Sequence, residues 1–448
     1  MATRINRRTF LSQSAAVGVL AVGCHSEAVL AESRSPNERL NIAAIGATGR
    51  AGADIRGCAS QNIVAIADID SELLARGAKP YPNAKKYEDF RVMLEKEANG
   101  IDAVIVGTAD HTHAPAAAMA MRMKKHVYCE KPLTHTVYEA RTLANLAKKN
   151  NLATQMGTQI HAGDNYRRVV ELVQTGAIGK IREVHVWVGV NYTGSRFVKA
   201  KVKPDHVNWD LWLGPVEARP YCEGIVNGER TSVHNYHWRW FWDFGTGGLG
   251  DFGCHYMDLP HWALKLRNPT KVSAKGPKPH PEGTTSGLVV SYEYPARDKL
   301  PPVKMTWYDG GKKPKLLDTL KGAPKDQNGR PMGLGSGHLF VGEQGWIISN
   351  YGQHSLLPED KFADFKRPDP FIPKSIGHHN EWINAVKTGD PTTCNFEYSG
   401  ALTESVLLGV ASYRSGETIE WNTEKLKVTN SEKAQQFIHK EYRKGWTL

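Results

Sequence analysis

Lysine, aspartate and histidine side chains in two short motifs could together take a proton from a hydroxyl group and stabilise the anion that is left. Lys131 follows a β-branched and aromatic run and precedes a proline, which favours extended backbone in the residue before it. Its ammonium could stabilise an alkoxide. Asp251 and His255 lie four positions apart, so in a helix they would share one face. The carboxylate could then orient the imidazole, and a histidine near neutral pKa suits the base.

Each motif also has a purely structural explanation. A lysine before a proline commonly marks the end of an edge strand. An aspartate and a histidine in a helix are often a cap and a core histidine whose hydrogen bonds are satisfied. The rest of the chain decides between the two explanations.

A nucleotide-binding pattern precedes both motifs. The apolar run 40–45 leads into the turn 46–52, and a second apolar run ends at Asp68. A tight turn, a helix N-terminus for the phosphates and a carboxylate for the ribose hydroxyls are what a dinucleotide fold needs, and the spacing suits them. The glycine pattern is imperfect, because Thr48 stands where a Cβ would crowd the pyrophosphate. Even so, the combination predicts a dinucleotide site.

Three further apolar strands are expected at 103–107, 126–129 and 153–157, with helices at 116–123 and 138–149 between them. This alternation predicts a doubly wound parallel sheet. Ligands of such sheets bind beyond the carboxyl ends of the strands. The candidate cofactor residues in these places are Gly46, Thr48, Gly49, Arg50, Asp68, Thr108, His113, Glu130 and Lys131.

The pattern changes after residue 158. An alternating strand at 181–190 and strand-like runs at 287–294, 303–308 and 345–349 predict a second domain on a largely antiparallel sheet. Helices are expected at 166–175, 379–388 and 399–415, a loop-rich aromatic region at 209–244 and a long loop at 309–337. The predicted fold class is therefore α/β: an N-terminal Rossmann doubly wound parallel sheet, then an α+β domain with a large, mostly antiparallel open sheet.

The first 31 residues are interpreted as a targeting segment. Arg7 and Arg8 form a twin-arginine pattern, and the apolar stretch that follows is too short for a permanent membrane span. We expect cleavage after Ala31 and export to the periplasm, with lipidation at Cys24 as the weaker alternative. The predicted divisions are 1–31 signal peptide, 39–158 Rossmann domain, 159–425 substrate and oligomerisation domain, and 426–448 polar tail.

Composition excludes several classes of protein. The net charge of +11 is spread along the 448 residues, which argues against a nucleic-acid partner. No His-x-x-x-His or paired cysteine spacing occurs, so no metal site is predicted. Folding before export favours buried free thiols over disulfides. No transmembrane span is expected beyond the signal.

The chain resembles the Gfo/Idh/MocA family of glucose-fructose oxidoreductase and inositol dehydrogenase. The motifs that carry the resemblance are Glu130-Lys131-Pro132, Gly176 to Lys180, Gly247 to His255 and the late helix pair. Residues 209–215 and 234–244 resemble the exported bacterial branch. The resemblance implies that Lys131 contacts the substrate hydroxyl and the nicotinamide side of the cofactor, with Asp251 and His255 at the nicotinamide end. It also implies a homo-oligomer, a dimer or tetramer.

The expected function is hydride transfer between NAD and a secondary alcohol of a sugar or cyclic polyol. Asp68 favours NAD over NADP because a carboxylate repels a 2′-phosphate, although Arg50 could partly offset this. The candidate substrate residues are Gln159, His237, Trp238 and Arg239. Two alternatives stay open: a glycosidase or lyase that oxidises its substrate transiently and then reduces it again, and a sugar sensor without catalysis.

Overall fold

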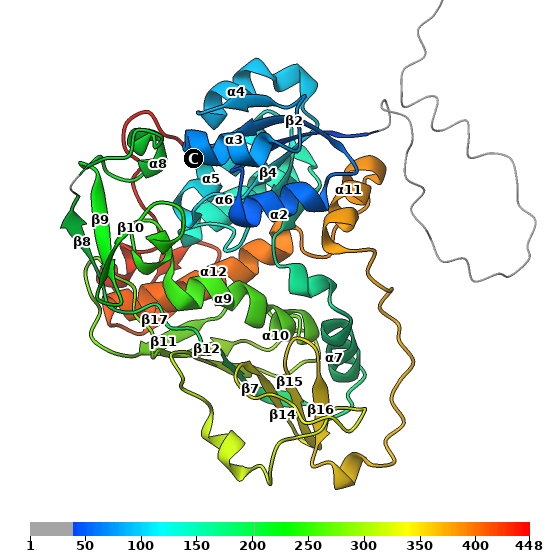
Figure 1. The fold of residues 1–448 in the computed structure, drawn as a ribbon. Coiled ribbons are helices and arrows are strands. Elements are labelled where there is room, and N and C mark those ends of the chain that lie inside the picture. Colours follow the sequence, from blue (N-terminus) through cyan, green and yellow to red (C-terminus); the bar gives the residue numbers. More distant parts are fainter. Residues whose placement is uncertain (1–38, 201) are drawn as a thin grey trace, which may run out of the picture. The chain divides into compact units, whose positions relative to one another are not determined.

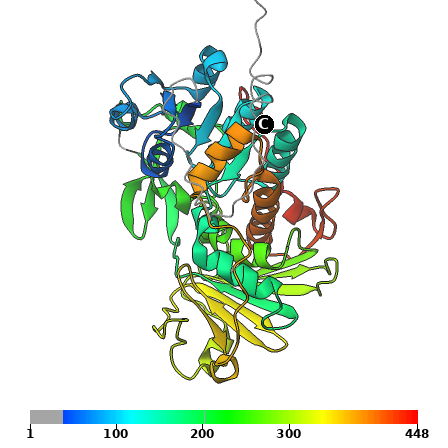
Figure 2. The ribbon, with the colours of Figure 1, turned by 90° about the vertical axis from the view of Figure 1, so that its right-hand side faces the viewer.

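The computed structural model describes residues 39–200 and 202–448 (Figures 1 and 2). The predicted twin-arginine signal, its cleavage after Ala31 and the alternative lipid site at Cys24 lie outside the described residues. Within them, no helix is both long enough and apolar enough to cross a membrane.

The first domain is built on a parallel sheet of six strands in the order β3-β2-β1-β4-β5-β6. Continuous apolar runs form its central strands because helices bury the sheet on both faces. The strands are β1 (Asn41–Ile45), β2 (Asn62–Ala67), β3 (Lys85–Tyr87), β4 (Ala103–Val106), β5 (His126–Cys129) and β6 (Thr154–Met156). The predicted doubly wound sheet is confirmed. The pattern missed β3, which is short and polar.

The helices of this domain connect its strands. They are α2 (Gly49–Gly57), α3 (Ser71–Ala78), α4 (Phe90–Lys96), α5 (Asp110–Arg122) and α6 (Val137–Asn150). Helix α5 begins at Asp110 rather than at residue 116, so that Pro115 lies inside the helix instead of in the preceding loop. The side chain of Thr136 and that of Glu139 form a capping box that fixes the start of α6.

The second domain is built on a nine-stranded sheet in the order β16-β15-β14-β7-β13-β12-β11-β17-β18. Its strands are β7 (Ile181–Trp187), β11 (Lys271–Lys275), β12 (Val289–Tyr294), β13 (Val303–Tyr308), β14 (Gly337–Gly342), β15 (Gly345–Ser349), β16 (His354–Leu357), β17 (Ile419–Asn422) and β18 (Lys427–Val428). Strands β7 and β13 are parallel, and the other neighbours are antiparallel. The predicted mostly antiparallel sheet is confirmed.

Helices of the second domain lie between this sheet and the Rossmann domain (Figure 1). They are α7 (Asp164–Gln174), α9 (Gly247–Tyr256), α10 (Asp258–Ala263) and α12 (Phe396–Ser415). Helix α12 packs against α6, α9 and β11, so its burial joins the two domains. Helix α11 (His378–Thr388) returns to the Rossmann domain and packs against α2.

The aromatic region expected to be mostly loop contains a separate three-stranded antiparallel sheet. Its strands are β8 (Ser195–Lys199), β9 (Cys222–Val226) and β10 (Glu229–Ser232), and the short helix α8 (Trp209–Leu213) lies between β8 and β9. These strands pack on a buried aromatic cluster that includes Trp212, Trp240, Phe241 and Phe244. The sheet was missed because its strands are short and partly polar.

The segment 426–448, expected to be a polar tail, is ordered and packs on the fold. It includes β18 and helix α13 (Glu432–Gln435), and Ile438 is buried. Near its end, the ring of Trp446 lies 5.9 Å from that of Phe90 in the Rossmann domain. The apolar residues that make these contacts are few and widely spaced among charged ones. They show no helix or strand periodicity, so the sequence predicted a polar tail.

Four of the cysteines in the described chain are buried and free, namely Cys58, Cys129, Cys254 and Cys394, and Cys222 is half-buried and free. The prediction of free thiols is confirmed for these five residues.

Candidate active site

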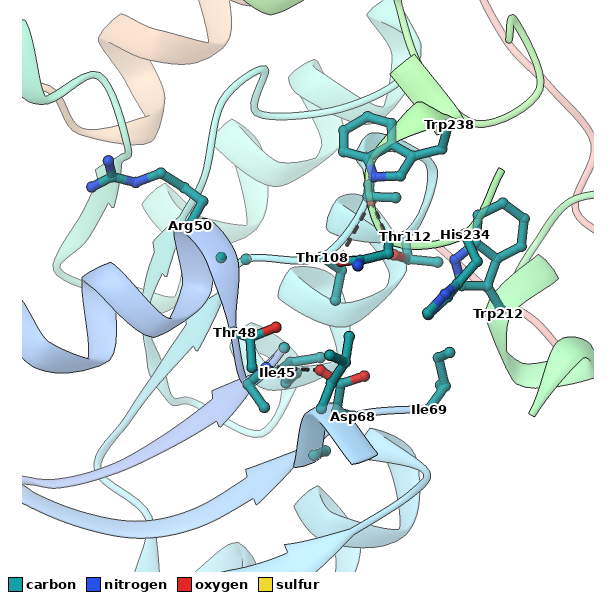
Figure 3. Close-up of a pocket in the computed structure, with 18 of the residues that line it drawn as sticks. Ile45, Thr48, Arg50, Asp68, Ile69, Thr108, Thr112, Trp212, His234 and Trp238 are labelled. Carbon is teal, nitrogen blue, oxygen red and sulfur yellow. Dashed lines mark hydrogen bonds between the residues drawn. The ribbon is translucent and has the colours of Figure 1, made fainter. Parts of the chain in front are cut away.

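A cavity opens at the carboxyl ends of the Rossmann strands (Figure 3). The loops after β1, β2, β4 and β5 form its floor, and the chain between β8 and α9 forms its roof. The predicted cofactor residues that line it are Gly46, Thr48, Gly49, Arg50, Asp68, Thr108, Glu130 and Lys131. The roof contributes Leu211, Trp212, His234, Asn235, Trp238 and Arg239.

The turn between β1 and α2 leaves room for a phosphate group. Gly46 and Gly49 have φ values of +96° and +59°, which favour glycine. No atom lies within 4 Å of the point where a Cβ would stand on Gly49. Thr48 has extended backbone, and its side chain caps none of the N–H groups of α2. These N–H groups are therefore free to bind an anion such as a pyrophosphate.

Asp68 closes this turn from the end of β2. Its Oδ2 accepts a hydrogen bond from the backbone N of Ala47 at 2.9 Å, and its Oδ1 accepts one from Asp70 at 3.1 Å. Each oxygen keeps a second lone pair, so that ribose hydroxyls can also donate to the carboxylate. Burial raises the pKa of Asp68 to about 6, which leaves the group mostly ionised at neutral pH.

Arg50 lines the cavity but points away from Asp68 (Figure 3). Its Nη2 lies 3.1 Å from Asp54 Oδ1, and its Nε lies 3.3 Å from Glu130 Oε1. These two ion pairs hold the Arg50 guanidinium away from Asp68. The expectation that Arg50 could offset the repulsion between Asp68 and a 2′-phosphate is therefore wrong for this geometry.

Glu130 is buried at the end of β5. Gln159 Nε2 donates to its Oε1 at 2.7 Å, and the backbone N of Lys131 donates to its Oε2 at 3.2 Å. Burial, and then the charge of Asp54, raises the pKa of Glu130 above its usual range. A Cβ on Gly157 would lie 2.2 Å from Oε1, so a larger residue there would displace the Glu130 carboxyl group from its present position.

His113, predicted to bind the cofactor, does not line the cavity. Its Nδ1 lies 2.8 Å from the carbonyl oxygen of Pro132, and its Nε2 lies 3.0 Å from that of Thr108. Burial lowers the pKa of His113 to about 4, so a neutral ring donates to one of the two carbonyls. His113 therefore packs between the loops after β4 and β5 and is hydrogen-bonded to one of them, whereas Thr108 lines the cavity.

The two predicted catalytic motifs meet. The Lys131 ammonium contacts Asp251 Oδ1 and donates to the backbone oxygen of Asp251 at 2.9 Å, across 120 positions of sequence. The side chains are 12% and 8% exposed. Burial by itself would raise the pKa of Asp251. The charges of Lys131 and then Arg239 outweigh burial and lower this pKa to about 2. Asp251 in turn raises the pKa of Lys131, although burial opposes this. The pair is therefore ionic at physiological pH.

Tyr192, which the sequence did not single out, holds the other oxygen of Asp251. Its hydroxyl donates to Oδ2 at 2.8 Å, and Arg239 Nε lies 3.7 Å from the same atom. The ring of Tyr192 packs on Trp240 with centroids 4.3 Å apart. Tyr192 follows the end of β7, where no pattern of spacing marks it as part of a site.

His255 does not pair with Asp251 as the sequence predicted. Helix α9 carries both residues, but the carboxylate faces Lys131 and Tyr192. In the described chain the buried Nδ1 of His255 has no hydrogen-bond partner. The physical reason is competition, because a charged ammonium is a stronger donor to a carboxylate than a neutral imidazole is. Burial, and then the charge of Lys131, lowers the pKa of His255 to about 3, so the ring is neutral.

A second carboxyl group lies buried near this pair. Asp110, at the start of α5, accepts a hydrogen bond from Thr246 Oγ1 at 2.7 Å, and its Oδ1 has no partner among the described residues. Burial, and then the charge of Asp251, raises the pKa of Asp110 to about 7. Because Thr246 immediately precedes α9, Asp110 links α5 to the helix that carries Asp251.

Asp110→Asn is expected to make thermal stability less dependent on pH. A folded-state pKa of about 7, above the ordinary 3.8, means that the folded protein holds this proton more tightly than the unfolded chain does. The resulting stability is present below about pH 4 and is lost as the pH rises through 7. Melting curves between about pH 5 and about pH 8 test this. Asp89→Asn, at the N-cap of α4, is the control. Parallel slopes for wild type and Asp110→Asn would contradict the prediction.

Two of the four predicted substrate residues, Trp238 and Arg239, line the cavity. The Arg239 guanidinium lies 4.1 Å over the Trp238 ring. Gln159 does not line the cavity. Its amide donates to Glu130 and, at 2.8 Å, to the Tyr128 hydroxyl. His237 lies outside it, with Nδ1 2.9 Å from Thr231 Oγ1.

The roof residues Trp212 and His234 were not predicted to belong to a site. The only signal was the density of aromatic residues between 209 and 244, which is equally typical of a core. Over 39–200 and 202–448, no three histidine, cysteine or acidic side chains are grouped to hold a metal ion.

Comparison with known families identifies both domains. Residues 40–158 match the NAD-binding Rossmann fold of the Gfo/Idh/MocA oxidoreductase family, and residues 164–300 match the C-terminal alpha/beta domain of the same family. The chain belongs to this family. The predicted family and fold class are therefore confirmed, and the first domain is an NAD-binding domain.

Curated members of the Gfo/Idh/MocA family match part of the chain. Myo-inositol 2-dehydrogenase of Thermotoga maritima is 28% identical over 118 residues, which are 26% of this chain and 35% of that protein. Levoglucosan dehydrogenase of Pseudarthrobacter phenanthrenivorans is 30% identical over 122 residues, 26% of this chain and 29% of that protein. The chain thus spans about a third of the length of these relatives.

Solved structures share the fold over most of the chain. GenD2 from gentamicin A biosynthesis, in complex with NAD, has a TM-score of 0.56 and 18% identity, and the match covers 91% of this chain and all of that one. Levoglucosan dehydrogenase in complex with NADH and L-sorbose has a TM-score of 0.55 and 15% identity, over 85% of this chain and 98% of that one. At these identities the likeness concerns the fold alone.

The residues of the cavity fit the NAD that this family's domain binds. The open first turn of α2 suits the pyrophosphate, and the ionised Asp68 suits the ribose hydroxyls. The position that a Cβ of Gly49 would fill is empty, so the cofactor phosphates can approach the backbone there. Lys131 and Arg239 line the same cavity and place two cations beside it.

Proposed function

We propose that this protein is an NAD-dependent oxidoreductase that acts on a secondary alcohol of a sugar or cyclic polyol. The contact between Lys131 and Asp251 carries the proposal, because it brings a Rossmann strand end and the glycine-rich helix α9 to one place beside the cavity. Bound NAD would accept the hydride that leaves the carbinol carbon.

Lys131 is proposed to stabilise the alkoxide. An ammonium has three donors, and Lys131 uses two of them on Asp251. The third N–H has no acceptor within the described chain and is available to a substrate hydroxyl. Asp251 keeps the ammonium charged and in place, so that it is preorganised for the developing negative charge.

His255 is proposed to take the hydroxyl proton. Burial, and then the charge of Lys131, lowers the pKa of His255 to about 3 and keeps the ring neutral, so transfer of the hydroxyl proton requires that this pKa rises in the complex with the alcohol. The buried Nδ1 has no hydrogen-bond partner in the described residues. The charge of Asp251 raises the pKa of His255 and so favours the protonated ring that forms during the reaction. Asp251 would then act on His255 through space rather than through a hydrogen bond.

Two measurements test the proposal. The purified protein is denatured and the released nucleotide is identified, and the native protein is assayed with NAD and a panel of alcohols. Myo-inositol, levoglucosan and L-sorbose, named with the relatives above, begin the panel. NADH formation that depends on both the alcohol and Lys131 supports the proposal. A protein that neither contains nor binds NAD would refute it.

A redox-neutral glycosidase or lyase is the second candidate, favoured by the roof over the cavity. Residues of both domains surround the space for the dinucleotide, which suits a cofactor that is reduced and oxidised again without leaving. Nitrophenyl glycosides cleaved without accumulation of NADH would establish this function instead. The export, the sugar itself and the homo-oligomeric state stay predictions.

Tyr192→Phe is expected to lower kcat about tenfold and to leave the affinity for NAD unchanged, because only a hydrogen bond to Asp251 is lost. The loss of this donor raises the pKa of Asp251, so the acid limb of the pH–rate profile moves to higher pH. Tyr294→Phe, whose hydroxyl faces His261 at 3.0 Å, is the matched control. An unaltered acid limb in Tyr192→Phe would contradict this role.

A further inference from the structure

The roof of the cavity is one continuous segment, residues 204–239, which we call the strap. It includes α8, β9, β10 and the turn that follows them. Figure 3 shows Trp212, His234 and Trp238 of the strap on the side of the cavity opposite Asp68 and Thr48. A dinucleotide in the cavity would therefore lie between the Rossmann floor and the strap.

The first fastening of the strap is at the loop between β2 and α3. The backbone N of Ser71 donates to the carbonyl of His206 at 2.9 Å, and the N of Asn208 donates to the carbonyl of Ile69 at 3.0 Å. Asp70 and Val207 form an isolated β-bridge between these two bonds. The strap thus adds an extended strand to the loop that carries Asp68.

The Asp70 carboxylate is at the centre of this fastening and is 3% exposed. Its Oδ1 caps α3 by accepting from the N–H groups of Glu72 and Leu73, both at 2.9 Å. Its Oδ2 faces two histidines of the strap, with His234 Nε2 at 3.5 Å and His206 Nε2 at 3.7 Å. Burial lowers the pKa of His234, so at neutral pH this contact is one between a carboxylate and a neutral ring. One carboxylate is therefore hydrogen-bonded to a Rossmann helix and lies against both ends of the strap.

A second fastening uses the C-terminal tail. The Arg443 guanidinium donates to the carbonyl of Gly214 and to the carboxylate of Asp210, each at 2.6 Å. The backbone N of Arg443 donates to the carbonyl of Pro215 at 3.1 Å. The same tail reaches the Rossmann domain, where Arg91 donates to the carbonyl of Gly445 at 3.2 Å. The tail therefore ties the α8 part of the strap to the first domain.

We propose that Asp70 and Arg443 are cofactor-retaining residues, which fasten the strap across the cavity so that NAD leaves only when the strap is released. The proposal rests on the proposed function, since it takes NAD as the molecule beneath the strap. Neither side chain lines the cavity. Asp70 touches the cofactor-binding Asp68 only through its backbone N, which a substitution keeps, so each side chain is proposed to act by positioning the strap.

Apolar packing of the strap on Ile69 and Ala109 is the competing explanation for its position. If apolar packing alone held the strap in place, removing the polar contacts of Asp70 or Arg443 would not change the rate at which the cofactor is released. The burial of Asp70 argues against this, because a carboxylate taken out of water needs its polar neighbours, here the N–H groups of α3 and the two polar rings of the strap. The experiment separates these explanations.

The experiment measures the release of bound NADH, followed by its fluorescence after mixing with excess NAD. Asp70→Ser keeps an N-cap for α3, since serine caps as well as aspartate, but is too short to reach His206 and His234. We expect it to release NADH about fivefold faster than wild type. Arg443→Met, which removes the side-chain bonds of the tail, is expected to act similarly from a distant position.

Two control variants are matched to these changes. Asn395→Ser replaces the N-cap of α12, and Arg330→Met removes an exposed ion pair with Asp326. Both are expected to release NADH at the wild-type rate. If Asp70→Ser and Arg443→Met both bind NADH and both release it at the wild-type rate, this proposal is overturned but the proposed function is not. A wild-type protein that binds no NADH would overturn the proposed function and this proposal with it.

Discussion

Lys131→Met is expected to lower kcat/KM for alcohol oxidation by about 10³-fold. Methionine keeps most of the volume of the side chain but removes the only ammonium beside Asp251 among the described residues. The loss of a preorganised donor to a developing alkoxide costs about 10²- to 10³-fold. Tyr192 and Arg239 still hold the other oxygen of Asp251, so the loss is chiefly that of the ammonium itself.

The same substitution is expected to destabilise the fold, because it leaves a buried carboxylate without its main partner. Breaking a buried pair typically costs about 3–5 kcal/mol. The double variant Lys131→Met with Asp251→Asn removes both charges and is expected to recover much of the melting temperature without recovering activity. This separates the catalytic effect from unfolding.

Lys125→Met is the control for the first substitution. Lys125 also lies in the Rossmann domain, where its ammonium bonds to the backbone oxygen of Ile101 at 2.8 Å, away from the cavity. It is expected to keep wild-type kcat. Activity within about threefold of wild type in folded Lys131→Met would exclude the alkoxide role, since a single lost donor exceeds that factor.

His255→Gln is expected to lower kcat by about 10²- to 10³-fold while NAD binding stays unchanged, since a glutamine amide cannot take a proton. His255 does not line the cavity in which the dinucleotide is proposed to bind. A fluorescence titration with NADH would measure this binding. His261→Gln is the control, because His261 is a buried histidine that bonds to the Tyr294 hydroxyl.

The pH dependence of the wild type provides a second test of His255. A histidine with its ordinary pKa would lose its base function below about pH 6.5. The pKa of about 3 in this structure predicts that kcat/KM shows no fall from His255 between about pH 8 and about pH 5. An acid limb near pH 6.5 that disappears in His255→Gln would show that the ring titrates normally and that its burial is relieved on binding.

The floor of the site could be predicted because it follows from local pattern. Apolar runs such as 40–45 and 126–129 become central strands of a parallel sheet, and the residues after them must meet at one edge. The convergence of Lys131 with Asp251 was also expected, but from a resemblance between motifs rather than from spacing. No local rule links positions 120 apart.

The roof and the orientation of Asp251 could not be predicted, because both depend on contacts between distant segments. Tyr192 reaches Asp251 from beyond β7, and His234 reaches Asp70 across 164 positions. The expected pairing of Asp251 with His255 followed from helical spacing alone. Asp251 and His255 do lie in one helix, as their spacing predicted. The Lys131 ammonium of the other domain is a stronger donor, however, and it pairs with the carboxylate.

The long stretch of sequence between the strap and Arg443 has a consequence for biosynthesis. Arg443 lies 229 positions after Gly214 and 233 positions after Asp210, so its bonds to them form only after all the intervening chain has been synthesised. A nascent chain can complete its Rossmann sheet much earlier and meet NAD with that end of the strap still unfastened. Fastening that end of the strap is thus a late event of synthesis, which follows completion of the Rossmann sheet.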